Sequence, residues 1–209
     1  AWRRMCTCYK GASTDLCDAI AIFTHMICTV LLLEGYLAPY VACRLIALNK
    51  NPGVRPIGVG EVFRRICSKA ALSVMRSDIM ESCGVEQACT GIPTGLESMH
   101  QAMEIAFQHD ETEALLLVDA QNAFNSLNRC AALHNIARVC PPLSQITTNT
   151  YQSPATLHVS GGGSILSREG TTQGDPLSMA IYAVALTPLV KFGLNSYRHN
   201  YYPIRLQTQ

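Results

Sequence analysis

A run of apolar residues that ends at a carboxylate constrains the fold of this chain more than any other feature. The five residues from Ala114 to Val118 are apolar, and Asp119 follows them directly. A short apolar run of this kind predicts a buried β-strand. A carboxylate at the end of such a strand is well placed to hold a hard cation such as Mg²⁺, which prefers oxygen ligands. Alternatively, Asp119 caps the following turn and Phe124 is an ordinary core residue.

Hydrophobic periodicity and turn residues predict the remaining elements. We predict helices over residues 15–33, 61–80, 95–108, 126–139 and 176–192, and hairpins over residues 43–59 and 155–167. Helices and strands do not alternate as βαβ units, so the pattern is typical of the α+β class.

Polar residues and prolines mark several of the helix ends. Thr94 and Glu97 have the spacing of a capping box. Asp175 as N-cap and Pro176 at the first helical position predict a well-defined start for the last helix. Pro141 and the proline after it predict the end of the helix over residues 126–139.

The composition is that of a globular protein. Hydrophobic residues make up 48% of the 209 residues and charged residues 15%, which argues against disorder. The apolar run at residues 19–33 is shorter than the roughly 20 residues of a membrane helix, and no secretory signal precedes it. We therefore expect an intracellular protein, in cytoplasm or nucleus, that does not enter a membrane. Because the chain begins with alanine, we also expect a fragment or a processed product.

Cysteine and charge are distributed unevenly along the chain. The 10 cysteines lack the spacing of a zinc site, so we read most of them as reduced and buried, with a structural zinc as the weaker alternative. Between residues 44 and 76 the only acid is Glu61, whereas the basic residues are Arg44, Lys50, Arg55, Arg64, Arg65, Lys69 and Arg76. Such a segment suits a polyphosphate or a nucleic-acid backbone, although a solvated helix face is the simpler explanation.

Two further groups of residues are candidates for ligand binding. Lys50 lies at the turn of the first predicted hairpin and Arg55 at the start of its second strand, a spacing that suits a triphosphate. Gln173 and Gly174 precede the start of a helix, where backbone N–H groups favour anionic or polar ligands. Glycine also allows a ligand to approach the backbone closely.

Three segments resemble the reverse transcriptases of non-long-terminal-repeat retroelements and their group II intron relatives. They occur in the order of that family and read RLIALNKNPGVRPIGVGEVFRRICSKA, LLLVDAQNAFNSLNR and EGTTQGDPLSMAIYAVALTPLV. The resemblance covers residues 40–192 and implies the fingers and palm of a right-handed polymerase, with an incomplete palm sheet and no thumb. It implies four regions: an N-terminal helical segment (1–40), a fingers-like region (41–112), a palm-like region (113–192) and an unassigned tail (193–209).

The resemblance also implies roles for individual residues. Asp119 corresponds to the first metal-binding aspartate, with the carbonyl of Ala120 as a further ligand, and Phe124 to the aromatic gate that excludes a 2′-hydroxyl. Lys50 and Arg55 correspond to residues that hold the incoming triphosphate, and Gln173 and Gly174 to residues that contact nucleotide and template. Residues expected to face the template backbone are Arg44, Arg64 and Arg65. The implied cofactor is Mg²⁺, with Mn²⁺ as a substitute, and the implied partners are an RNA template, a DNA primer and a deoxynucleoside triphosphate.

The chain departs from the family in its acidic residues. The family carries a pair of adjacent aspartates after the third segment, but residues 190–209 contain no Asp or Glu, and no Asp-Asp pair occurs in the sequence. We therefore expect a truncated reverse transcriptase that does not polymerise alone. The main alternative is a non-catalytic nucleic-acid-binding remnant of a retroelement. An unrelated α+β domain does not explain three segments in order, and Phe124 argues against a ribonucleotide polymerase.

Overall fold

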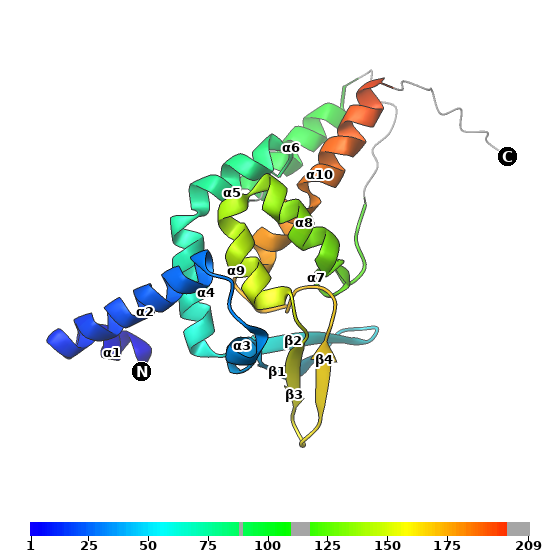
Figure 1. Ribbon diagram of the computed structural model, residues 1–209. Helices are drawn as coiled ribbons and strands as arrows, with labels where there is room; N and C mark the ends of the chain where they lie inside the picture. Colours follow the sequence, from blue (N-terminus) through cyan, green and yellow to red (C-terminus); the bar gives the residue numbers. More distant parts are fainter. Residues whose placement is uncertain (88–89, 110–117, 200–209) are drawn as a thin grey trace.

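The computed structural model describes residues 1–87, 90–109 and 118–199 of the chain. The fold is mixed α+β, as predicted, with a layer of helices over one end of a small sheet (Figure 1). The helices are α1 (Trp2–Thr7), α2 (Gly11–Thr29), α3 (Glu34–Val41), α4 (Val62–Val74), α5 (Arg76–Cys83), α6 (Gly95–Phe107), α7 (Ala123–Ser126), α8 (Arg129–Val139), α9 (Pro141–Tyr151) and α10 (Ser178–His199), with a 3-10 turn at Gly84–Glu86. The strands are β1 (Cys43–Asn49), β2 (Val54–Gly60), β3 (Ala155–Val159) and β4 (Ser164–Ser167).

The sheet joins two hairpins that are distant in the sequence. Its order is β2-β1-β3-β4, and both predicted hairpins are present as antiparallel pairs. The hairpins meet through a parallel pairing of β1 with β3, which places Arg44 opposite His158. This pairing was not predicted, because local sequence rules contain no information about which hairpins become neighbours.

The larger of two buried apolar clusters among the described residues joins helices from both halves of the chain. Side chains that are fully buried come from α8, α9 and α10, and include Ile136, Leu143, Ile146 and Val184. Burial of each such side chain stabilises the fold by about 1.5–3 kcal/mol. Ile27 of α2 belongs to the same core, so the N-terminal helices pack on the rest of the described chain.

The helix boundaries agree with the sequence in part. The helix predicted over 61–80 is divided at Met75 into α4 and α5. The prolines that end α8 also begin α9, which was not predicted although proline is favoured in a first helical turn. Helices α1 and α3 were not predicted individually, although the resemblance implied a helical segment over residues 1–40.

The proposed capping box is wrong. Thr94 precedes α6 with a φ of 54°, and its hydroxyl donates to the carbonyl of Pro93 at 2.7 Å, so it does not cap the helix. By contrast, Asn128 caps α8 by accepting a hydrogen bond from the backbone N–H of Ala131 at 2.9 Å.

The predicted strand before Asp119 lies mostly outside the described residues. Val118, its last residue, is described, and it has no regular structure and is 84% exposed. Its end is therefore not buried as expected. Among the described residues, no helix has the length and apolarity needed to cross a membrane.

Candidate functional site

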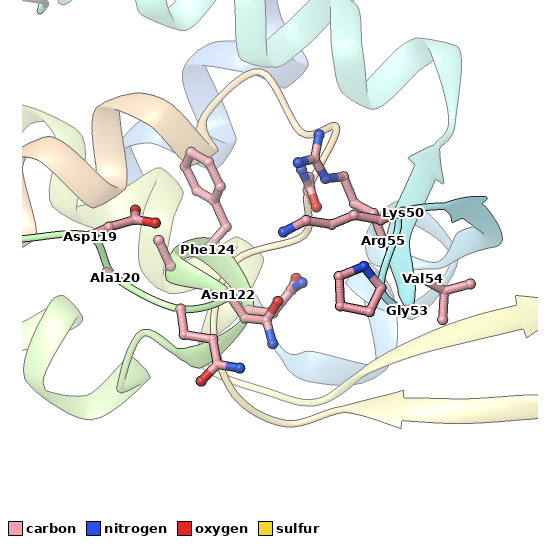
Figure 2. Close-up of a pocket in the computed structure, with 13 residues that line it drawn as sticks. Lys50, Gly53, Val54, Arg55, Asp119, Ala120, Asn122 and Phe124 are labelled. Carbon is pink, nitrogen blue, oxygen red and sulfur yellow. The ribbon is translucent and has the colours of Figure 1, made fainter.

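A pocket of about 720 Å³ lies between the β1–β2 hairpin and the loop that begins at Asp119 (Figure 2). It is lined by residues from all three segments that were singled out in the sequence. The predicted site residues that line it are Lys50, Arg55, Asp119, Ala120, Phe124 and Gln173. Residues so far apart in the chain meet here only because of the tertiary fold.

The hairpin contributes the positive charge of the pocket. Lys50 lies at the turn, where its N–H donates to the carbonyl of Gly53 at 2.9 Å, and Gly53 has the positive φ of 94° that this turn requires. The side chains of Lys50 and Arg55 are exposed, and neither forms an ion pair within the described part of the chain. Two unpaired cations on one wall attract anionic ligands.

The opposite wall carries the carboxylate and an aromatic ring. Asp119 and Ala120 are exposed, and Phe124 is half-buried on the short helix α7. Asn122 begins this helix in the left-handed conformation, with a φ of 51°, and its carbonyl accepts a hydrogen bond from the N–H of Asn125 at 2.8 Å. Figure 2 shows Asp119 and Phe124 across the pocket from Lys50 and Arg55.

The loop over residues 169–175 holds the two walls together. On one side, the N–H of Gly58 in β2 donates to the carbonyl of Gln173 at 3.0 Å. On the other, the N–H of Thr171 donates to the carbonyl of Phe124 at 2.6 Å, and that of Gly170 to Leu127 at 2.8 Å. Three backbone hydrogen bonds therefore set the distance between the β1–β2 hairpin and the loop that begins at Asp119.

Glycine is required where this loop touches β2. Gly174 has a φ of 111°, and a Cβ there would lie 2.9 Å from the carbonyl oxygen of Gly58. Gly174 does not line the main pocket; it lines a small crevice with Arg65. The close approach that we attributed to a ligand is thus made by the backbone of β2.

A buried ion pair also stabilises the loop over residues 169–175. The guanidinium of Arg64 pairs with the carboxylate of Asp175, and both side chains are only 2% exposed. The hydroxyl of Tyr151 also donates to Asp175 and accepts from the N–H of Thr172 at 3.3 Å. Burial, reinforced by the negative charge of Asp175, raises the pKa of Tyr151. Burial opposes the charge on Arg64, but Asp175, together with Tyr151 and Cys43, outweighs this and raises the pKa of Arg64 above its ordinary value.

This arrangement corrects the expectation that Arg64 faces a template backbone. Its side chain is enclosed and its Nη1 donates to the carbonyl of Val41 at 3.0 Å, so a nucleic acid does not reach it. Arg44 and Arg65 are exposed and remain available. Asp175 was predicted as the N-cap and Pro176 as the first residue of the last helix, but α10 begins at Ser178, so both lie in the turn before it. Within that turn, Oδ1 of Asp175 accepts a hydrogen bond from the N–H of Leu177 at 3.1 Å.

A second buried arginine was missed by the sequence analysis. Arg129 donates from Nε to the carbonyl of Gly170 at 2.7 Å and from Nη2 to the hydroxyl of Ser167 at 2.9 Å, and its guanidinium lies 5.4 Å from the ring centroid of Tyr151. Burial lowers its pKa. No local signal reveals this role, because an arginine in the first turn of a helix normally reads as a surface residue.

No family model matches the chain, and no curated protein matches it.

The described residues do not form a complete metal centre. Within residues 1–87, 90–109 and 118–199, no three His, Cys, Asp or Glu side chains gather at one place. Asp119, the carbonyl of Ala120 and the neighbouring side-chain amides offer oxygen ligands for a hard cation that arrives with its own ligands. They do not fit a pair of bridged metal ions. The cysteines that the structure describes are free thiols.

Proposed function

We propose that this chain is the fingers and palm part of an RNA-directed DNA polymerase similar to those of non-long-terminal-repeat retroelements, and that its pocket binds a deoxynucleoside triphosphate. One observation carries the proposal. Six residues chosen from three separate sequence segments, for their expected contacts with the nucleotide or its metal, line one pocket.

The chemistry of the two walls supports the same ligand. Lys50 and Arg55 suit the phosphates, because guanidinium and ammonium groups form charge-assisted hydrogen bonds with phosphate oxygens. Phe124, on the facing wall, then lies on the side of the sugar, where an aromatic ring leaves no room for a 2′-hydroxyl. The ligand is expected to bring Mg²⁺ as its counter-ion, with Asp119 as one protein ligand.

Nucleotide transfer does not follow from these residues alone. A two-metal reaction needs carboxylates that hold both ions, and the described residues supply only Asp119 at the pocket. We therefore expect this chain by itself to bind nucleotide and primer–template without extending the primer. Primer extension by the isolated chain would contradict this part of the proposal.

Replacing Lys50 or Arg55 with alanine should weaken binding of a Mg²⁺–dNTP complex about tenfold or more. Each loses a hydrogen bond between charged groups, which contributes about 1.5–3 kcal/mol. Titration of the purified chain with a fluorescent dNTP measures the effect. Arg138→Ala, at an exposed arginine outside the pocket, is the matched control and should leave the dissociation constant unchanged.

A second candidate function is nucleic-acid binding without a nucleotide site. Two observations favour it: Asp119 is the one carboxylate that the described residues place at the pocket, and Arg44 and Arg65 are exposed. In that case RNA binding should weaken steeply with salt, and no dNTP should bind. Lys50→Ala should then lower the affinity for RNA only by the small effect of one lost charge.

Asp119→Asn should reduce the contribution of Mg²⁺ to dNTP binding. The amide oxygen is a weaker ligand than a carboxylate, so affinity should fall about three- to tenfold in Mg²⁺, the size of one weak charge interaction. Without divalent cations the same substitution should not weaken binding, because a negative charge near the phosphates is removed. An equal loss of dNTP affinity with and without Mg²⁺ would mean that Asp119 does not contact the metal. Its exposure makes an effect on folding small.

A further inference from the structure

Phe124 lies between two cavities. In front of it lies the main pocket of about 720 Å³, and behind it a second pocket of about 580 Å³ between α5 and α10. Phe124 lines both. The second pocket is lined mainly by apolar side chains, among them Ile79, Met80, Met179 and Leu186. Space on both sides means that close packing alone does not hold the ring in place.

The backbone of Phe124 is nevertheless fixed. Its carbonyl accepts the hydrogen bond from Thr171, and Gly170 packs against it so closely that a Cβ on Gly170 would lie 2.3 Å from the same carbonyl oxygen. Rotation about the side-chain bonds is therefore the freedom that remains. That rotation would swing the ring backwards, out of the main pocket and into the second one.

Tyr182 opposes this rotation from behind. The two rings have centroids 5.3 Å apart and planes inclined at 55°, a tilted arrangement that aromatic pairs favour. Tyr182 lines the second pocket and does not line the main one. It lies in the second turn of α10, next to Ile181, which is 1% exposed in the core. Its position is thus set by the core and not by a ligand.

We propose that Tyr182 is a positioning residue for sugar discrimination, which holds the Phe124 ring at the front of the main pocket. The inference rests on the proposed function, in which Phe124 excludes a 2′-hydroxyl. Tyr182 makes no contact with the nucleotide and acts only through the ring of Phe124. Without Tyr182 the ring can retreat into the second pocket and leave room for a ribose.

The test compares the dissociation constants of dATP and ATP for the whole chain in Mg²⁺. Tyr182→Ala should tighten ATP binding and change dATP binding less than twofold. The ratio of the dissociation constant of ATP to that of dATP should therefore fall by roughly two- to tenfold, the range that one aromatic pair contributes. Tyr182→Phe should keep the wild-type ratio, because the ring makes the contact. Tyr182→Leu fills most of the same volume without a ring and should also lower the ratio. It takes the place of Tyr182→Ala in the test if the alanine variant does not fold.

Phe124→Val is the reference variant for this test. It should lower the ratio more than Tyr182→Ala does, and Tyr182→Ala should have no further effect on the ratio in the Phe124→Val background, because the residue that it positions is gone. An effect of Tyr182→Ala that adds fully to that of Phe124→Val would overturn the inference.

The outcomes separate the inference from the proposed function. Equal weakening of dATP and ATP by both Tyr182→Ala and Tyr182→Leu would show a merely structural role and overturn the inference alone. An unchanged ratio in Phe124→Val would remove the gate assignment, and with it the inference. Failure of the unaltered chain to bind either nucleotide would overturn the proposed function itself.

Discussion

Asp175→Asn should lower the free energy of unfolding by about 3–5 kcal/mol, the usual effect of removing one partner of a buried ion pair. The asparagine keeps the size of the side chain and an oxygen for the N–H of Leu177. What it removes is the negative charge that compensates Arg64, whose side chain is 2% exposed. Urea denaturation measures the change as a lower midpoint with an unchanged slope.

Two further variants test the electrostatic cause. Asp15→Asn makes the same chemical change at an exposed site in α2 and should alter stability by less than about 0.5 kcal/mol. The double variant Arg64→Met with Asp175→Asn removes both charges and should be more stable than Asp175→Asn alone. If the urea midpoint of Asp175→Asn equals that of the unaltered chain, the Arg64–Asp175 pair does not stabilise the loop over residues 169–175.

Gly170→Ala should destabilise the protein by about 2–5 kcal/mol and abolish nucleotide binding. Gly170 has a φ of 66°, and a Cβ there would lie 2.3 Å from backbone atoms of Phe124 and Asn125. Alanine therefore adds an unfavourable backbone conformation and an overlap with backbone that cannot move aside. The loop that carries Phe124 must shift, so dNTP affinity and thermal stability should fall together.

Gly162→Ala is the matched control for this change. Gly162 also has a positive φ, of 101°, but a Cβ there would meet no atom within 4 Å. Gly162→Ala should lower the free energy of unfolding only by the cost of the unfavourable backbone conformation, about 1–2 kcal/mol. It should bind dNTP normally. Similar losses for Gly162→Ala and Gly170→Ala would mean that the contact with Phe124 is unimportant.

The local elements show where sequence rules succeed. The hairpin β1–β2 follows from strand-forming residues on both sides of a turn that contains Pro52 and Gly53, and β3–β4 from a turn of glycines. The start of α10 was predicted two residues too early, because Asp175 and Pro176 form a turn that precedes the helix. The same rules failed at Thr94, where the hydroxyl found a different acceptor.

The pocket was predictable only in its components. The sequence singled out Lys50, Arg55 and Asp119 as chemically suitable residues, but nothing local states that they meet. Their meeting depends on three backbone hydrogen bonds from the loop over residues 169–175 to β2 and to the loop after Asp119. Tyr182 was not singled out, because its contact with Phe124 joins two segments that the sequence leaves separate.

The sequence by itself determined the α+β class, the two hairpins and the chemical character of the candidate site. These properties follow from side-chain periodicity, turn residues and charge, which act over a few residues. The tertiary structure alone decided that Arg64 and Arg129 are buried while Lys50 and Arg55 are exposed, although all four are equally charged in the sequence. The physical reason is that the cost of burying a charge depends on its partners, and the partners of Arg64 and Arg129 come from distant segments of the chain.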